Sequence, residues 1–125
     1  MFGKLKENIA NINNQEKALE GMNTIHEENA KKLLIEGEEI IQCYGLLLDF
    51  ACLTNKRLFF VDASINGKKK VVSVPYKNID EVSCDYGHLR GEVEIYTKQN
   101  KYELKMGTGL ADKFAKDILT QMFEN

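Results

Sequence analysis

The spacing of apolar residues changes near Glu36 and Gly37, and this change divides the chain into two parts. Before these residues, apolar side chains recur every three or four positions among polar ones, which is typical of an amphipathic helix. After them, apolar and polar residues alternate over short runs, which is typical of β-strands. The pattern therefore predicts a helical N-terminal extension over residues 1–36 and a β-domain over residues 37–125.

The N-terminal extension has two apolar stripes, and the polar residues 11–15 and Gly21 break the helical pattern between them. Part of the pattern repeats every seven residues, but polar residues at the complementary positions argue against a long coiled coil. We expect one or two short amphipathic helices that either dock on the β-domain or contact a neighbouring subunit. The stripes contain Leu5, Ile9 and Ile12, and then Leu19, Met22, Ile25, Ala30, Leu33 and Leu34.

Seven short apolar runs in the β-domain predict seven strands. The clearest turn between them is Asn66-Gly67, because both residues tolerate positive φ. Strands that follow one another through tight turns are antiparallel, since parallel strands need a longer crossover. The runs lie at residues 40–48, 50–54, 57–62, 71–76, 79–86, 93–95 and 102–106.

A helical spacing returns after residues 107–109, where Thr108 is suited to cap a helix. Leu110, Phe114 and Ile118 recur at every fourth position and predict an amphipathic helix of about four turns. A small antiparallel sheet bends into a barrel or into two packed sheets, and a final helix closes its open end.

Three stretches of the sequence carry a family likeness. They are residues 34–41 (LIEGEEII), residues 50–62 with the core LTNKRL, and residues 73–79 (SVPYKNI). In this order they resemble the bacterial pleckstrin-homology (PH) domain family over residues 34–123. The resemblance implies a mainly β fold: a bent β-barrel or two-sheet sandwich of about seven antiparallel strands, closed by a C-terminal α-helix. It also implies a cytoplasmic binding or scaffolding role, cyclic homo-oligomers and no catalytic activity.

The residues within these stretches are predicted to set the fold. Asn55 and Lys56 are expected to form a turn, and Arg57 to lay its stem along the sheet with its head group in water. Pro75 lacks a ladder donor, so we expect it at a strand end or a sheet edge. The connection at residues 48–50 is short and acidic, unlike the basic loop with which eukaryotic PH domains hold phosphoinositides.

The composition is that of an ordinary globular protein, with 43% hydrophobic and 29% charged residues. The net charge of −2 and the isoelectric point near 5.7 argue against a nucleic-acid partner, which would require clustered Lys and Arg. One dense basic run, Lys68, Lys69 and Lys70, is expected to be a solvated hairpin tip, with contact to an anionic surface as the alternative. Residues 1–6 lack the apolar core of a signal peptide, so we expect a cytoplasmic protein.

Side chains that could bind a metal or form disulfides are few and scattered. Cys43, Cys52 and Cys84 are odd in number and form no C-x-x-C pair, so we expect buried small hydrophobes rather than a disulfide framework. His26 and His88 have no ligand-like spacing and are expected at the surface. The sequence therefore predicts no metal site.

Sequence patterns typical of catalysis or cofactor binding are not found. Residues 107–109 precede a helix but lack the Lys-Ser/Thr ending of a phosphate-binding loop, so a plain helix cap is favoured. Glu92 and Glu94 alternate along one strand and are expected on its solvated face. We therefore predict a protein that is not an enzyme and binds no cofactor.

Three functional hypotheses remain. The first is a scaffold that assembles with itself, because residues 40–48 and 59–61 carry more apolar side chains than such a domain needs to bury. The second is a protein- or peptide-binding module that receives a segment along an open sheet edge. The third, least favoured because of the acidic net charge, is peripheral binding to anionic membranes through Lys68–Lys70, with Lys56 and Arg57.

Overall fold

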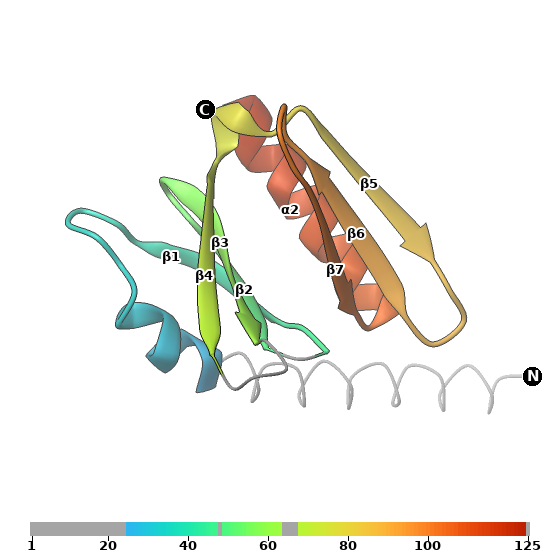
Figure 1. The fold of residues 1–125 in the computed structure, drawn as a ribbon, viewed down its shortest axis with the longest axis horizontal. Coiled ribbons are helices and arrows are strands. Elements are labelled where there is room, and N and C mark those ends of the chain that lie inside the picture. Colours follow the sequence, from blue (N-terminus) through green and yellow to red (C-terminus); the bar gives the residue numbers. More distant parts are fainter. Residues whose placement is uncertain (1–24, 48, 64–67, 125) are drawn as a thin grey trace, which may run out of the picture.

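The computed structural model describes residues 25–47, 49–63 and 68–124, which form two antiparallel sheets and a long C-terminal helix (Figure 1). The first sheet has the strand order β1-β2-β3-β4, and the second has the order β5-β6-β7. The seven predicted strands and the C-terminal helix are confirmed. The elements are β1 (Ile40–Gly45), β2 (Phe50–Thr54), β3 (Arg57–Ala63), β4 (Lys69–Pro75), the short 3-10 turn η1 (Tyr76–Asn78), β5 (Glu81–Tyr86), β6 (Gly91–Tyr96), β7 (Lys101–Met106) and α2 (Thr108–Glu124).

Of the two predicted architectures, the described strands form the pair of packed sheets and not a closed barrel. The first strand is also shorter than expected. The strand ends at Gly45, and the Leu46 N–H donates to the Asp49 carbonyl at 2.7 Å across the turn that follows. Pro75 ends β4, an edge strand, as predicted, and Tyr76 begins η1 instead of extending the strand. The predicted Asn66-Gly67 turn and the end of the first run, Leu48, lie outside the described residues.

The main core lies between the two sheets and is closed by α2, which packs against β5 and β6. Phe114 of α2 is fully buried, and its ring centre lies 4.7 Å from that of Tyr44 on β1. The helix approaches β6 so closely that a Cβ at Gly91 would overlap the Cβ of Ala111. Glycine at position 91 is therefore what permits this contact.

The start of α2 differs from the prediction. The first helical hydrogen bond runs from the Ala111 N–H to the Gly107 carbonyl at 2.8 Å. The Thr108 hydroxyl does not cap the helix but donates to the Gly87 carbonyl at 3.1 Å. This bond ties the helix start to the β5–β6 turn.

The outer face of the first sheet is covered by the segment that precedes β1. Residues 25–31 are helical, and Ala30, with Leu33 and Leu34, packs on that face. The described part of the N-terminal extension therefore docks on its own β-domain; residues 1–24 lie outside the described residues. The covered side chains include Cys43, Phe50, Cys52, Phe59 and Val61.

His26 belongs to this covering segment and is not the surface histidine that was predicted. Its ring stacks on Phe50, with 5.2 Å between the ring centres, and it is half-buried. Burial lowers the pKa of His26, against the opposing effect of the Asp49 charge. His88, in contrast, is exposed in the β5–β6 turn, as expected.

Candidate interaction site

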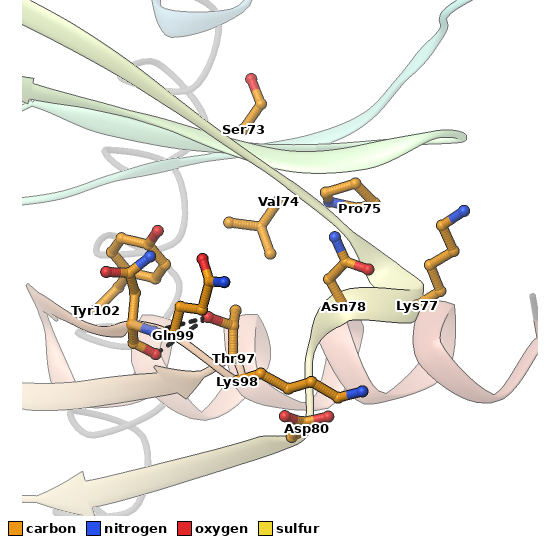
Figure 2. Close-up of a pocket in the computed structure, with 11 residues that line it drawn as sticks. Ser73, Val74, Pro75, Lys77, Asn78, Asp80, Thr97, Lys98, Gln99 and Tyr102 are labelled. Atoms are coloured by element: carbon orange, nitrogen blue, oxygen red, sulfur yellow. Dashed lines mark hydrogen bonds between the residues drawn. The ribbon is translucent and has the colours of Figure 1, made fainter.

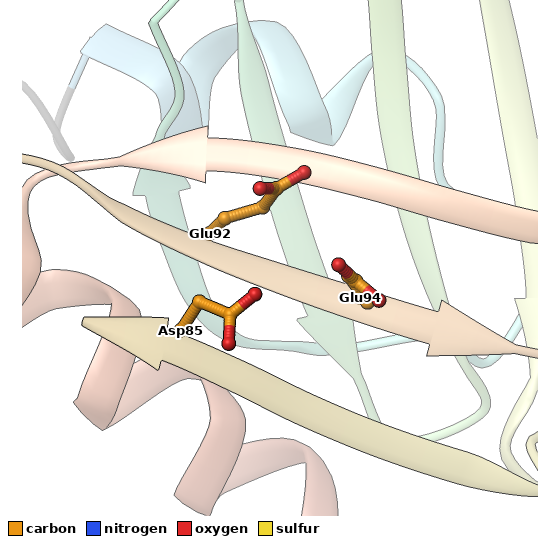
Figure 3. A group of neighbouring side chains, drawn as sticks. All are labelled: Asp85, Glu92 and Glu94. Carbon is orange, nitrogen blue, oxygen red and sulfur yellow. The ribbon is translucent and has the colours of Figure 1, made fainter. Parts of the chain in front are cut away.

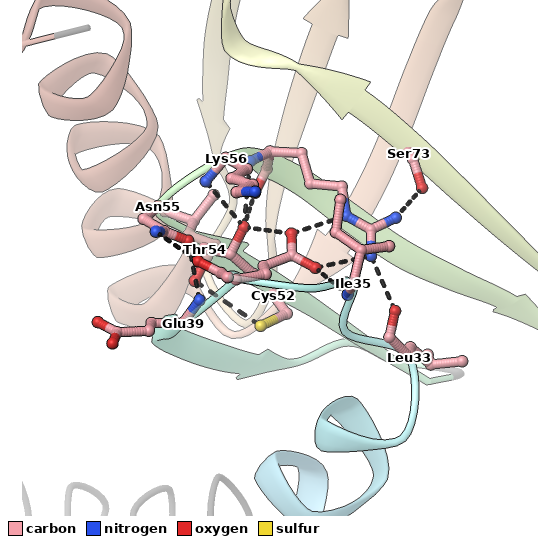
Figure 4. Close-up of polar contacts among 12 residues, drawn as sticks. Leu33, Ile35, Glu39, Cys52, Thr54, Asn55, Lys56 and Ser73 are labelled. Atoms are coloured by element: carbon pink, nitrogen blue, oxygen red, sulfur yellow. Dashed lines mark hydrogen bonds and ion pairs between the residues drawn. The ribbon is translucent and has the colours of Figure 1, made fainter.

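The three stretches that resemble the PH family meet in one polar network over the β2–β3 hairpin (Figure 4). Arg57 binds the Glu38 carboxylate with two nitrogens, at 2.8 and 2.9 Å. It also donates to the Leu33 carbonyl at 2.8 Å and to the Ser73 hydroxyl at 2.6 Å. We call Leu33, Glu38, Thr54, Arg57 and Ser73 the clamp, because they join the covering segment to β2, β3 and β4.

At the centre of the clamp, Arg57 and Glu38 form a buried ion pair, and both side chains also form hydrogen bonds to other clamp residues. The Glu38 side chain is fully buried, and the Thr54 hydroxyl donates to it at 2.6 Å. Burial raises the pKa of Glu38, but the hydrogen bonds from Arg57 and Thr54 and the Arg57 charge outweigh burial and lower the pKa to about 2. Glu38 is therefore ionised at neutral pH.

A second layer of hydrogen bonds holds the covering segment to the β2–β3 turn. The Asn55 amide accepts from the Glu39 N–H at 2.8 Å and donates to the Gly37 carbonyl at 3.2 Å. Lys56 donates to the Glu36 carbonyl at 2.9 Å. Gly37 has φ of +77°, a conformation that suits glycine. Asn55 and Lys56 therefore lie in the turn between β2 and β3, as predicted, and tie it to the covering segment.

The Arg57 head group, however, was predicted to lie in water, and this prediction is wrong. The side chain is only 16% exposed. Its acidic partner is 19 positions away in the sequence, a separation that no local pattern reveals.

An apolar hollow of about 370 Å³ lies where the β1–β2 turn, the β5–β6 turn and the start of α2 meet. Leu89 at its rim is 89% exposed, and Leu47 is 54% exposed. The sequence analysis did not predict this surface. The sequence feature that could have indicated it is Leu89, an apolar residue inside the predicted turn between Gly87 and Gly91. We call this surface the leucine end: Gly45, Leu46, Leu47, Leu89, Arg90, Met106, Gly107 and Leu110.

The two turns of the leucine end are fixed by hydrogen bonds. The Leu47 N–H donates to the Lys105 carbonyl at 2.9 Å. The Gly87 N–H donates to the Arg90 carbonyl at 2.8 Å, and the Gly87 carbonyl accepts from Thr108. Leu89 is thus presented by a turn that is closed at its base.

Two further hollows, of about 390 and 440 Å³, share Tyr102 of β7 in their linings. The first is bounded by Val74 and Pro75 of β4 and by the β6–β7 turn (Figure 2). The second is lined by the consecutive residues Lys101–Lys105, so it follows the strand edge that no other described strand pairs with. We call these two hollows the β7 groove.

Three carboxylates gather on the outer face of the second sheet: Asp85, Glu92 and Glu94, whose oxygens lie within 4.8 Å of one another (Figure 3). Glu92 and Glu94 lie on the outer face of β6, as predicted, and are half-buried there. Glu94 accepts a hydrogen bond from Tyr96, which lowers the pKa of Glu94, and Lys101 lies 3.4 Å away. Because neighbouring side chains already compensate Glu94, we assign no ligand to this cluster.

The basic run predicted as a possible anionic-surface contact, Lys68 to Lys70, is exposed at the start of β4. Lys69 lies 3.6 Å from the Asp49 carboxylate. Lys70 is opposite Asp62 in the β3–β4 ladder. Acidic groups thus stand beside two of the three lysines. Among the described residues, no helix is long and apolar enough to cross a membrane.

Two packed antiparallel sheets closed by a C-terminal helix define a PH-like domain. The model of the family described as "Bacterial PH domain" matches residues 8–111, and the chain belongs to this family. The chain is similar to a PH domain from Shewanella amazonensis SB2B (TM-score 0.65, 20% identity, 77% of this chain and 94% of that one). It is also similar to a DUF1696 family protein with a PH domain from Shewanella loihica PV-4 (TM-score 0.57, 20% identity, 76% and 87%).

Two relatives from Bacillus subtilis (strain 168) match parts of the chain. The uncharacterized protein YozO is 50% identical over 56 residues, which are 42% of this chain and 49% of YozO. The uncharacterized protein YjqA is 38% identical over 61 residues, which are 47% of this chain and 49% of YjqA. The chain thus spans about half the length of these relatives.

Proposed function

We propose that this chain is a non-enzymatic, cytoplasmic binding and assembly domain whose leucine end docks on another copy of the same chain. The observation that carries the proposal is Leu89, a leucine that is 89% exposed on a fixed turn beside an apolar hollow. An apolar knob next to an apolar hollow suits a contact in which each copy supplies both parts, either in a symmetric pair or around a closed ring.

The covering segment changes where such an interface should be sought. Residues 40–48 and 59–61 first suggested assembly, but Cys43 and Phe59 are covered by the chain's own residues 30–34. The leucine end has no such cover among the described residues. The tendency to form cyclic homo-oligomers that the family resemblance implies supports the same proposal.

Light scattering after size-exclusion chromatography at micromolar concentration tests the proposal. The chain mass is 14.3 kDa, and we expect the wild type to elute with a multiple of this mass. Leu89→Ser should return the protein to the mass of one chain. The matched control is Phe123→Ser, which changes a side chain that is 84% exposed outside the leucine end and should leave the mass unchanged. A wild type with the mass of a single chain at every concentration would end the proposal.

A second candidate function rests on the β7 groove, which could receive an extended segment of another protein. The Lys105 carbonyl faces away from β6, toward Leu47, and alternate residues of a strand point to the same side. The backbone groups of Lys101 and Glu103 therefore also face the groove, where a guest strand can pair with them.

Pull-down from a cell lysate tests this second function. The bait is the wild type, compared with Glu103→Pro, which removes an N–H from the free edge but none from the β6–β7 ladder. Partners that pair with β7 should be absent from the proline variant, while its circular dichroism spectrum stays that of the wild type. Recovery of the same proteins by both baits would exclude the groove.

A further inference from the structure

Cys43 and Cys52 lie directly opposite each other on β1 and β2. The bond from the Leu46 N–H to the Asp49 carbonyl marks that pair as hydrogen-bonded, and hydrogen-bonded pairs alternate with non-hydrogen-bonded ones. Three positions further along the ladder, the two cysteines fall at a non-hydrogen-bonded pair. There the Cα atoms are about 4.5 Å apart and the side chains are at their closest.

This geometry suits a disulfide, whose Cα atoms are usually about 4.4–6.8 Å apart. Both cysteines are free and fully buried, and both side chains belong to the cluster under the covering segment. The two thiols interact, because a hydrogen bond with Cys43 is the largest cause that raises the pKa of Cys52. Cys84 lies on β5 in the other sheet and packs against the main core, so it cannot compete for either thiol.

We propose that Cys43 and Cys52 are an oxidation site that closes into a reversible intrachain disulfide. The oxidant class is a peroxide, with hydrogen peroxide as the simplest member. One sulfur attacks the peroxide, the O–O bond breaks, and a sulfenic acid and one water result. The second sulfur attacks the sulfenic sulfur, the S–S bond forms, and the S–O bond breaks to release a second water. The two thiols lose two electrons and two protons, and a dithiol reverses the step through a mixed disulfide.

The covering segment controls access to this pair. Ala30, with Leu33 and Leu34, packs on the cluster that contains both sulfurs. The clamp holds this segment through the bond from Arg57 to the Leu33 carbonyl. Burial and the raised pKa of Cys52 keep that sulfur protonated, and thiols react slowly compared with thiolates. Oxidation should therefore be slow in the closed protein and fast when the segment is loosened.

The test treats the whole chain with hydrogen peroxide, unfolds it, labels the remaining thiols with a maleimide and maps the linked peptides by mass spectrometry. We expect two of the three thiols to disappear, one Cys43–Cys52 link within a single chain, a mass lower by two hydrogen atoms, and full reversal by dithiothreitol. Cys84→Ser is the matched control and should give the same link. Cys43→Ser and Cys52→Ala should give none.

Access is tested with Glu38→Gln, which weakens the clamp and should speed the loss of both thiols at least tenfold. Equal rates in this variant and in the wild type would overturn the control by the covering segment. Links that involve Cys84 or two chains, or further oxidation of either cysteine without a link, would overturn the disulfide itself. So would three intact thiols after prolonged exposure of both proteins.

Discussion

The clamp and the leucine end are opposites in both sequence and structure. The clamp collects all three stretches that resemble the PH family, and its charged groups are buried with partners. The leucine end contains none of these stretches, and two of its leucines, Leu47 and Leu89, are open to solvent. The three stretches that carry the family likeness therefore hold segments of the chain together, and the proposed interface lies outside them.

The largest expected effect comes from breaking the clamp. Arg57→Ala leaves the Glu38 charge buried without its counter-ion, so the free energy of unfolding should fall by about 3–5 kcal/mol. Urea unfolding at neutral pH measures this loss. Lys98→Ala, which changes an exposed lysine outside the clamp and the leucine end, is the control and should alter stability by less than about 0.5 kcal/mol. A loss below about 1 kcal/mol for Arg57→Ala would make the clamp an ordinary surface ion pair.

A somewhat smaller effect should appear at acid pH. The pKa of Glu38 is about 2 in the folded protein, below its ordinary 4.5, so its stabilising contribution is complete above pH 4.5. That contribution is lost as the pH falls toward 2, and it amounts to roughly 3 kcal/mol. The stability difference between the wild type and Glu38→Gln should shrink over this interval. A difference that stays constant from pH 5 to 2 would show that Glu38 is not held ionised.

The next largest effect on stability is expected from a substitution at the contact between α2 and β6. Gly91→Ala forces a methyl group against Ala111, which should reduce the free energy of unfolding by about 1–3 kcal/mol. Gly109→Ala is the matched control, because an added Cβ there meets nothing within 4 Å and alanine favours the helix. It should stabilise the protein by about 0.5–1 kcal/mol. Equal effects of the two substitutions would mean that helix and strand are not in close contact.

The smallest effect on the folded monomer is expected at the leucine end. Leu89 is almost fully exposed, so Leu89→Ser should change the stability of the dilute monomer by less than about 0.5 kcal/mol. The wild type should instead become more stable as its concentration rises, because association favours the folded state. Thermal unfolding over a hundredfold range of concentration checks both statements. A Leu89→Ser protein whose melting temperature still rises with concentration would place the interface elsewhere.

How far the sequence predicts this molecule depends on the distance over which each interaction acts. The strands and α2 follow from the periods of nearby apolar residues, as at Tyr102, Leu104 and Met106 of β7. The Arg57–Glu38 ion pair joins residues 19 positions apart, and the spacing of apolar residues along the chain does not predict it. The Thr108 hydroxyl was expected to act locally and instead binds Gly87, on a turn 21 positions earlier.

The candidate site was less predictable than the fold for the same reason. Leu47, Leu89 and Leu110 come from three separate parts of the chain, and only the packing of the two sheets and α2 brings them together. The Cys43–Cys52 pairing depends on the β1–β2 register, which the Leu46–Asp49 turn sets. The odd number of cysteines argues against a disulfide framework, but it does not show whether two of the thiols lie opposite each other on neighbouring strands, as those of Cys43 and Cys52 do.

Hydrogen–deuterium exchange on dilute and concentrated protein tests most directly whether copies meet at the leucine end. At high concentration we predict slower exchange for the amides of residues 45–47 and 87–91. The amides of residues 33–39 and 54–57, around the clamp, should exchange at the same rate in both samples. Equal exchange at residues 87–91, or protection that grows only along β7, would contradict the proposed interface.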